Sequence, residues 1–111
     1  MIKVLIVDDD VLFARSLTRV ASSAGMEASM VHSAEQALKV VEEDPPDLAF
    51  VDVGLPGMSG IELVEQLTSA EQPVNCIMVS GQTTFQAAVD AMRAGALDFI
   101  PKASELPEIQ F

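Results

Sequence analysis

Short apolar runs alternate with amphipathic stretches along the whole chain, and this alternation limits the fold more than any other feature of the sequence. The run KVLIV at residues 3–7 is apolar on consecutive positions, which is typical of a parallel strand buried on both faces. The stretches between such runs carry apolar residues at helical spacing. Repeated strand–helix units with right-handed crossovers predict an α/β domain, in which helices cover both faces of a parallel sheet.

Strand-like runs and capping signals set the expected boundaries. Five strands are expected at residues 3–7, 27–31, 47–53, 75–80 and 97–100. Four helices are expected at about residues 11–24, 33–43, 59–69 and 83–94. Three helices begin with the spacing of a capping box, in the pairs Ser33 and Gln36, Ser59 and Glu62, and Thr83 and Gln86. Residues 1–111 therefore fit a single domain.

Several residues have a structural role as their simplest interpretation. The buried face of the fourth helix is expected to consist of four residues at helical spacing, Phe85, Ala88, Val89 and Met92. Asp10 stands where the first helix begins, so we expect it to be the N-cap. His32 follows the weakest strand and is expected at the surface, whereas Cys76 lies inside a strand and is expected in the core.

Polar residues gather where the strands end, and they are Asp8, Asp9, Asp10, Asp52, Ser80 and Lys102. In a parallel sheet these ends lie at one edge, so the carboxylates would share a small space with one ammonium group. Clustered carboxylates repel one another, and oxygen ligands without Cys or His favour a hard divalent ion such as Mg²⁺. Gly54 could add a backbone carbonyl oxygen to such a site.

Most of these residues, taken one at a time, also have a simpler structural interpretation. Taken singly, Ser80 is more often a strand-end hydroxyl bonded to nearby backbone, and Lys102 is more often a solvated charge. Asp52 differs, because an isolated carboxylate at a buried strand end is costly unless it is paired or coordinated. The residues together therefore indicate a functional site more strongly than any one of them.

The charge balance narrows the classes of partner. With 17 acidic and 6 basic residues the formal charge is −11, and such a chain repels phosphate backbones, so direct nucleic-acid binding is not expected. No apolar run approaches the roughly 20 residues needed to span a membrane. The one cysteine cannot form an internal disulfide, and we expect a cytoplasmic protein.

Four blocks of sequence resemble the receiver domain of two-component response regulators, in the order and spacing of that family. The blocks are VLIVDDD at 4–10, DLAFVDVGLPGMSGIELVEQL at 47–67, CIMVSGQ at 76–82 and AVDAMRAGALDFIPK at 88–102. The resemblance covers nearly the whole chain. It implies a flavodoxin-like, doubly wound sheet of five parallel strands in the order 2-1-3-4-5.

The resemblance also implies a role for individual residues. Asp52 would accept a phosphoryl group, and Lys102 would pair with a phosphoryl oxygen. Ser80 would be the switch hydroxyl, and Phe99 the aromatic side chain that reports the phosphorylation state. Mg²⁺, or Mn²⁺ in its place, would be held by Asp8, Asp9, Asp52 and the backbone carbonyl of Gly54.

Partners follow from the same resemblance. The phosphoryl group would come from a histidine kinase or a histidine phosphotransfer protein. The surface of helix 4, strand 5 and helix 5 would control an effector domain or a downstream protein. The chain would phosphorylate and dephosphorylate only itself and is not expected to be an enzyme with independent turnover.

The end of the chain leaves room for only the start of a fifth helix. We expect a short helix beginning near Ser104, and we expect this receiver to be the N-terminal part of a longer regulator or to form a homodimer. Leu106, Ile109 and Phe111 would then pack on the domain or across the dimer interface.

Two other classes of protein are alternatives to a receiver domain. A metal-dependent aspartyl phosphatase of the haloacid dehalogenase type also uses an Asp nucleophile and Mg²⁺. It expects a second Asp two residues after the nucleophile, where this chain has Gly54. A flavodoxin-like redox module would need aromatic residues beside a flavin, and the chain has no Trp or Tyr.

Overall fold

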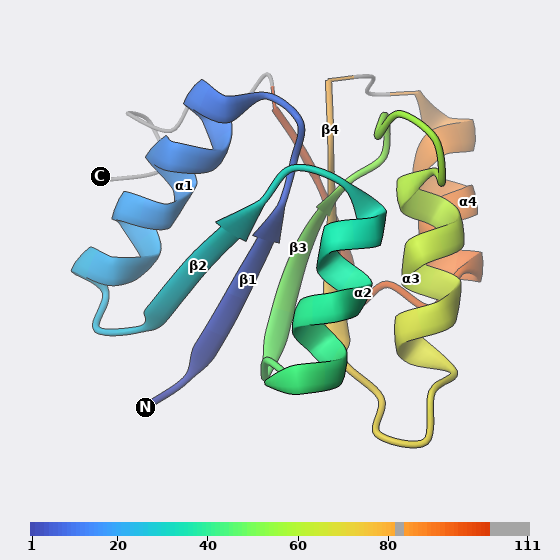
Figure 1. Ribbon diagram of the computed structural model, residues 1–111. Coiled ribbons are helices and arrows are strands. Elements are labelled where there is room, and N and C mark those ends of the chain that lie inside the picture. The colour runs from blue at the N-terminus through green and yellow to red at the C-terminus, as the bar shows by residue number, and fades with distance from the viewer. Residues whose placement is uncertain (82–83, 103–111) are drawn as a thin grey trace.

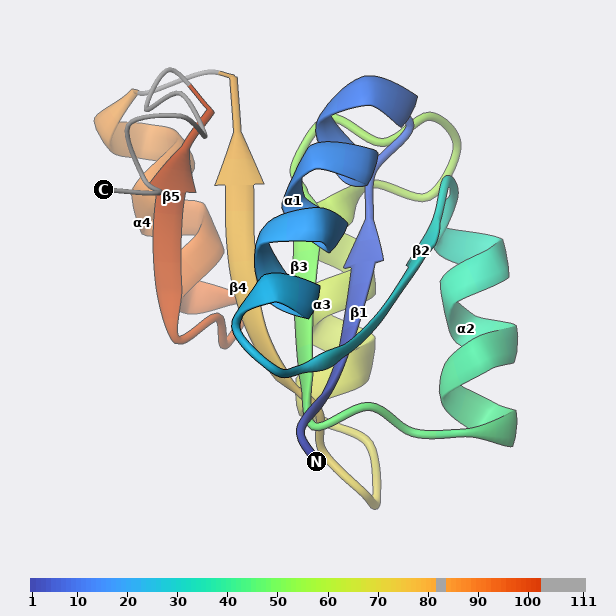
Figure 2. The same cartoon turned by 90° about the vertical axis from the view of Figure 1, so that its left-hand side faces the viewer.

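Five parallel strands form one sheet in the order β2-β1-β3-β4-β5, as expected (Figures 1 and 2). The structure is a computed structural model that describes residues 1–81 and 84–102. The strands are β1 (Lys3–Val7), β2 (Glu27–Val31), β3 (Leu48–Asp52), β4 (Asn75–Ser80) and β5 (Asp98–Pro101). The helices are α1 (Val11–Ser23), α2 (Ala34–Glu43), α3 (Gly60–Thr68) and α4 (Phe85–Arg93).

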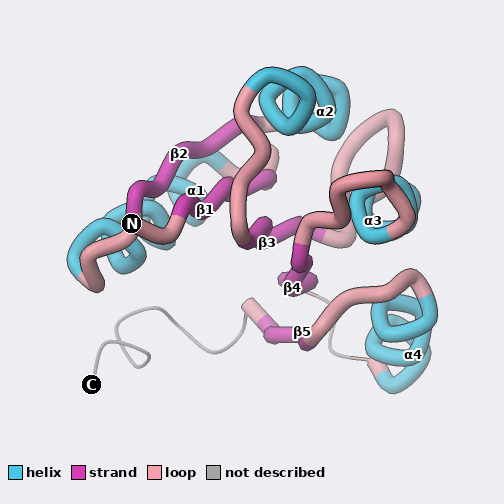
Figure 3. The backbone as a smooth tube through the Cα atoms, turned by 90° about the horizontal axis from the view of Figure 1, so that it is seen from below, coloured by secondary structure: helices cyan, strands magenta, loops and turns pink. Residues whose placement is uncertain are grey.

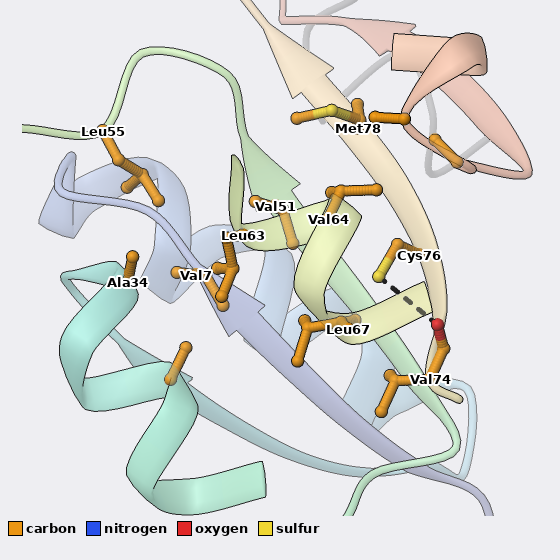
Figure 4. Close-up of a cluster of buried hydrophobic side chains, with 14 of the residues drawn as sticks. Val7, Ala34, Val51, Leu55, Leu63, Val64, Leu67, Val74, Cys76 and Met78 are labelled. Carbon is orange, nitrogen blue, oxygen red and sulfur yellow. Dashed lines mark hydrogen bonds between the residues drawn. The ribbon is translucent and has the colours of Figure 1, made fainter. Parts of the chain in front are cut away.

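The helices divide between the two faces of the sheet. α1 lies on one face, and α2, α3 and α4 lie on the other (Figure 3). The larger core cluster lies between the sheet and these three helices and includes Val51, Leu63, Val64 and Met78, all fully buried (Figure 4). A smaller cluster of Val4, Ile6 and Ala14 lies under α1. The continuous apolar strands are therefore covered on both sides, as their sequence requires.

The register of the ladders brings the functional candidates to one edge. Val7 pairs with both Val31 and Val51, so β1, β2 and β3 end at the same level. Asp52 pairs with Val79, and Ser80 pairs with Pro101, which carries the same level across β4 and β5. The carboxyl ends of all strands thus meet at one edge of the sheet.

The predicted caps are confirmed at three helices and displaced at the fourth. Asp10, Ser33 and Ser59 are the N-caps of α1, α2 and α3, and each side chain accepts a backbone N–H three residues later. The N-cap of α4 is Thr84, whose side chain accepts the N–H of Ala87 at 3.1 Å. The prediction that Thr83 caps this helix is therefore wrong by one residue.

The predicted buried face of α4 is wrong at its two largest residues, whereas Ala88 and Val89 are half-buried. Phe85 is 85% exposed and Met92 is 50% exposed, whereas Ala91 is fully buried. α3 and α4 lie close together at their C-terminal ends, where the hydroxyl oxygen of Thr68 is 3.0 Å from the carbonyl oxygen of Ala94. A Cβ atom at the adjacent Gly95 would lie 2.7 Å from the same hydroxyl oxygen, so only small residues fit at this contact.

One further prediction is confirmed, and another concerns residues that the structure does not describe. Cys76 is fully buried in the larger core cluster, as expected. The helix expected near Ser104, with Leu106, Ile109 and Phe111, lies outside the described residues. Among the residues that the structure describes, no helix combines the length and apolar character needed to cross a membrane.

Candidate functional site

Three carboxylates meet at the carboxyl edge of the sheet. Asp8 follows β1, Asp9 is the next residue, and Asp52 is the last residue of β3. One oxygen from each of them lies within 4.8 Å of the others. Asp8 and Asp52 are buried and Asp9 is exposed, so the cluster opens to solvent on the side of Asp9.

Asp8 is held by bonds on both carboxylate oxygens. Its Oδ1 accepts the backbone N–H of Asp10 at 2.9 Å. Its Oδ2 lies 2.8 Å from the Nζ atom of Lys102. Because the side chain is only 2% exposed, these two partners replace the water that an ionised carboxylate would otherwise require.

Lys102 directly follows β5, and its ammonium group bridges the two buried carboxylates. Its Nζ atom also lies 3.4 Å from Oδ1 of Asp52 and 4.7 Å from the ring centroid of Phe13, a residue in the first turn of α1. The backbone N–H of Lys102 donates to the carbonyl of Ser80 at 2.7 Å. The bond to β4 thus fixes the backbone of Lys102, while two carboxylates and an aromatic ring surround its ammonium group.

The charges of this site shift the pKa values of two groups in the same direction. Burial and the charge of Asp8 raise the pKa of Asp52, and Lys102 and a backbone hydrogen bond from Gly54 lower it by less. Burial lowers the pKa of Lys102, but the hydrogen bond with Asp8 and the charge of Asp52 outweigh it, so the pKa stands above its usual value. The site therefore holds excess negative charge that one ammonium group compensates in part.

The donor set fits a hard divalent cation. All three candidate side-chain ligands are carboxylates, and Mg²⁺ prefers such oxygens at about 2.1 Å. Around one ion, two ligand oxygens lie at most about 4.2 Å apart, so the present spread of up to 4.8 Å requires only small side-chain movements. The uncompensated negative charge supplies the electrostatic reason for a cation to bind.

Of three further candidates, two lie beside this cluster and one does not. Ser80 is 3% exposed at the end of β4, beside the strand that carries Asp52. Gly54 follows β3 so closely that a Cβ atom at this position would lie 3.8 Å from Oδ2 of Asp52. Phe99 lies in β5, half-buried, and packs against the larger core cluster. The structure thus brings every predicted site residue except Phe99 to the carboxyl edge.

Two residues at this edge were missed or misjudged from the sequence. His32 was expected at the surface, but it is half-buried and its Nδ1 atom lies 2.8 Å from the carbonyl oxygen of Asp8. The expected strand order already places β2 beside β1, but the sequence pattern does not fix the register that brings position 32 beside position 8. The contact between Phe13 and Lys102 has no signal in the sequence.

Comparison with known proteins identifies the family. The chain matches the family model of the response regulator receiver domain over residues 4–110. It therefore belongs to this family, and the resemblance seen in the sequence is confirmed.

Curated relatives agree with this assignment. The two-component response regulator PhoP of Pseudomonas aeruginosa is 33% identical over 108 residues, which are 97% of this chain and 48% of that protein. The response regulator MprA of Mycobacterium ulcerans is 31% identical over 108 residues, 97% of this chain and 47% of that protein. The chain thus spans about half the length of these relatives.

Solved structures show the same fold. A CheY-like response regulator receiver domain protein from Methanospirillum hungatei superposes with a TM-score of 0.88 at 29% identity, over 98% of this chain and 87% of that one. A response regulator protein from Burkholderia pseudomallei gives a TM-score of 0.87 at 25% identity, over 98% of this chain and 64% of that one. The latter was crystallised with a phosphorylated aspartic acid, a calcium ion and citrate.

Proposed function

We propose that Asp52 accepts a phosphoryl group in a Mg²⁺-dependent reaction, and that the donor is a histidine kinase or a histidine phosphotransfer protein. The observation that carries this proposal is the surrounding of one buried carboxylate, with two further carboxylates within 4.8 Å and the Lys102 ammonium group at 3.4 Å. The phosphorylated aspartic acid and the calcium ion in the Burkholderia neighbour support the same chemistry for this chain.

The transfer itself requires a nucleophile and compensation of charge. A carboxylate oxygen of Asp52 attacks the phosphorus atom of the donor's phosphohistidine, the phosphorus–nitrogen bond breaks, and the imidazole leaves. Lys102 compensates charge on the phosphoryl oxygens. Mg²⁺, or Mn²⁺ with the same preference for oxygen, would neutralise the remaining charge when bound. Its ligands would be Asp8, Asp9, Asp52 and the backbone carbonyl of Gly54.

Ser80 and Phe99 are the proposed switch residues. The phosphoryl group on Asp52 would offer the Ser80 hydroxyl a strong acceptor, and movement of Ser80 would reach β5 because its carbonyl binds the N–H of Lys102. Phe99 would then exchange between two positions beside β4. The surface of α4, β5 and the helix expected after them would differ between the two states.

This activity is a signalling event and not independent turnover. We expect the chain to phosphorylate itself from a donor and to lose the phosphoryl group by hydrolysis. We also infer that it is the N-terminal part of a longer response regulator, with an effector domain or a downstream protein as the recipient of the signal. Relatives of about twice its length support this inference.

Two further expectations accompany this function. A cytoplasmic location is in line with the single cysteine, which cannot form an internal disulfide. Burial raises the pKa of Cys76 to about 12 and leaves it an unreactive core thiol. The formal charge of −11 remains the argument against direct nucleic-acid binding by this domain.

The decisive experiment is to phosphorylate the chain with acetyl phosphate and Mg²⁺ and to measure its intact mass. We expect one phosphoryl adduct on the wild-type chain, none on Asp52→Asn, and an undiminished adduct on the control Asp90→Asn, which changes an exposed carboxylate of α4. An adduct that persists in Asp52→Asn would refute the assignment. Steady hydrolysis of a phosphate ester would favour the phosphatase alternative.

A further inference from the structure

His32 contacts the acidic edge from the end of β2. Its Nδ1 atom lies 2.8 Å from the backbone carbonyl oxygen of Asp8. A carbonyl oxygen can only accept a hydrogen bond, so Nδ1 must carry the hydrogen and donate it. The ring is therefore bonded to one of the residues proposed to hold the metal.

The backbone of His32 is fixed by the start of α2. Its N–H donates to Oε1 of Gln36 at 2.8 Å, and the N–H of Gln36 donates to the hydroxyl of Ser33 at 3.1 Å. These bonds form a variant of the capping box, in which the Gln side chain returns to the residue before the cap. Only the two side-chain torsions of His32 then remain to be ordered by the bond to Asp8.

The backbone of Asp8 is bonded on both sides to the end of β2. Its N–H donates to the carbonyl of Val31 at 3.1 Å, and its carbonyl accepts from His32. This carbonyl belongs to the planar peptide unit that joins Asp8 to Asp9. The imidazole therefore fixes the orientation of this peptide unit, and with it the direction in which the side chain of Asp9 leaves the backbone.

Asp9 depends on this orientation more than Asp8 does. The carboxylate of Asp8 is already held by Asp10 and Lys102. Asp9 is exposed, and its carboxylate must point back toward the buried pair to share an ion with it. A rotation of the peptide unit between the two residues would turn this carboxylate away.

On the basis of the proposed metal site, we propose that His32 is a positioning residue for it. By donating from Nδ1 to the Asp8 carbonyl, His32 orients the peptide unit between two carboxylate ligands of a hard divalent cation. It does not touch the ion. Residues that orient metal ligands in this way typically change affinity by about 10- to 100-fold when they are removed.

The test is a titration of the full chain with Mg²⁺, followed by NMR shifts of its backbone amides. We expect His32→Ala to weaken the Mg²⁺ affinity by about 10-fold. His32→Asn places an amide N–H at the position of Nδ1, so it should restore most of the affinity. His32→Gln carries its amide one bond further out and should not restore it.

Thr84→Ala is the control for a merely structural role. It removes the N-cap of α4 and should lower the melting temperature, but it touches neither His32 nor Asp8 and should leave the Mg²⁺ affinity unchanged. The inference is overturned if His32→Ala binds Mg²⁺ as the wild-type chain does, or if the Asn and Ala variants are equally weakened.

The wild-type chain gives an independent answer should the variants not fold. The NMR shifts of the two imidazole nitrogens report which of them carries the hydrogen. We expect a protonated Nδ1, and an Nε2–H tautomer would overturn the inference. Failure of the wild-type chain to bind Mg²⁺ at all would instead overturn the proposed metal site.

Discussion

The carboxyl group of Asp52 lies in surroundings that disfavour its charge. Its pKa is raised by burial and by Asp8, so the folded chain binds this proton more tightly than the unfolded chain does. Stability therefore falls as the pH rises from the unfolded value through the folded value, and the ionised group destabilises the fold at neutral pH. The reactive residue is thus one that the fold would be more stable without.

Replacing this carboxylate should stabilise the protein. We expect Asp52→Asn to raise the melting temperature at pH 7, by roughly 4–8 °C for each 1 kcal/mol of relief, because Lys102 keeps Asp8 as its partner. The gain should shrink as the pH falls through the raised pKa of Asp52, where the wild-type carboxyl group takes up its proton. Thermal melts without metal over a series of pH values measure this, and a lower melting temperature at pH 7 would contradict it.

Phe13 places an aromatic face 4.7 Å from the Lys102 ammonium group. A cation over such a ring gains about 0.5–2 kcal/mol, depending on how far it is desolvated. We expect Phe13→Leu to slow phosphorylation of Asp52 by about 2- to 30-fold, because Lys102 loses one of the contacts that position it. The rate of adduct formation, followed by intact mass, measures the effect.

Two control variants separate the ring from simple packing. Phe13→Tyr keeps an aromatic face and should phosphorylate nearly as fast as the wild-type chain. In a Lys102→Met background, Phe13→Leu should cause no further loss. An equal loss with and without the lysine would mean that Phe13 acts through packing alone.

At the scale of elements, strong and regular patterns were predicted correctly. The runs KVLIV and NCIMVS became β1 and β4 with the predicted bounds, since consecutive apolar residues suit a strand covered on both faces. β3 ends at Asp52, one residue before its predicted end at Val53. The cap residues of α1, α2 and α3 were predicted because their chemistry is local.

The errors concern relations between elements. α4 carries two apolar stripes, and the prediction chose the larger residues, Phe85 and Met92. Which stripe faces inward depends on how near α3 lies, and that distance is not encoded in α4 itself. The contact of His32 with Asp8 was missed for a similar reason, because it depends on the register between β1 and β2.

The start of α3 lies so close to the end of β3 that position 60 has no room for a side chain. A Cβ atom at Gly60 would overlap the carbonyl oxygen of Asp52 and lie 2.8 Å from its carbonyl carbon. These are backbone atoms in a buried ladder, so they cannot move aside independently. The start of α3 can therefore lie against the strand that carries Asp52 only because position 60 is a glycine.

We expect Gly60→Ala to destabilise the fold by about 3 kcal/mol, because α3 must shift away from the sheet. Gly81→Ala is the matched control, since a Cβ atom there meets nothing within 4 Å, and it should change stability by less than about 0.5 kcal/mol. Urea unfolding of both variants measures the difference. Equal stability of the two would show that α3 is not held against the strand.

For the whole molecule, a divalent cation should act as a stabilising ligand. A ligand that binds only the folded chain raises the free energy of unfolding by about 2.7 kcal/mol when its concentration is 100 times its dissociation constant. We therefore expect the melting temperature to rise with Mg²⁺ concentration. Asp9→Ala should remove most of this rise, while its effect without metal should be small because Asp9 is exposed. A rise that is unchanged in Asp9→Ala would argue against a shared site.

The sheet order also bears on how the chain becomes competent during its synthesis. Asp8 follows β1 and Asp52 ends the adjacent strand β3, so their carboxylates can meet once the first half of the chain has emerged from the ribosome. Lys102 arrives last, and its N–H bond to Ser80 forms only when β5 joins the edge of the sheet. A nascent chain that stops short of β5 therefore has its acidic cluster without the ammonium group that compensates it. The step that adds β5 to the sheet is consequently also the step that brings Lys102 to the reactive centre.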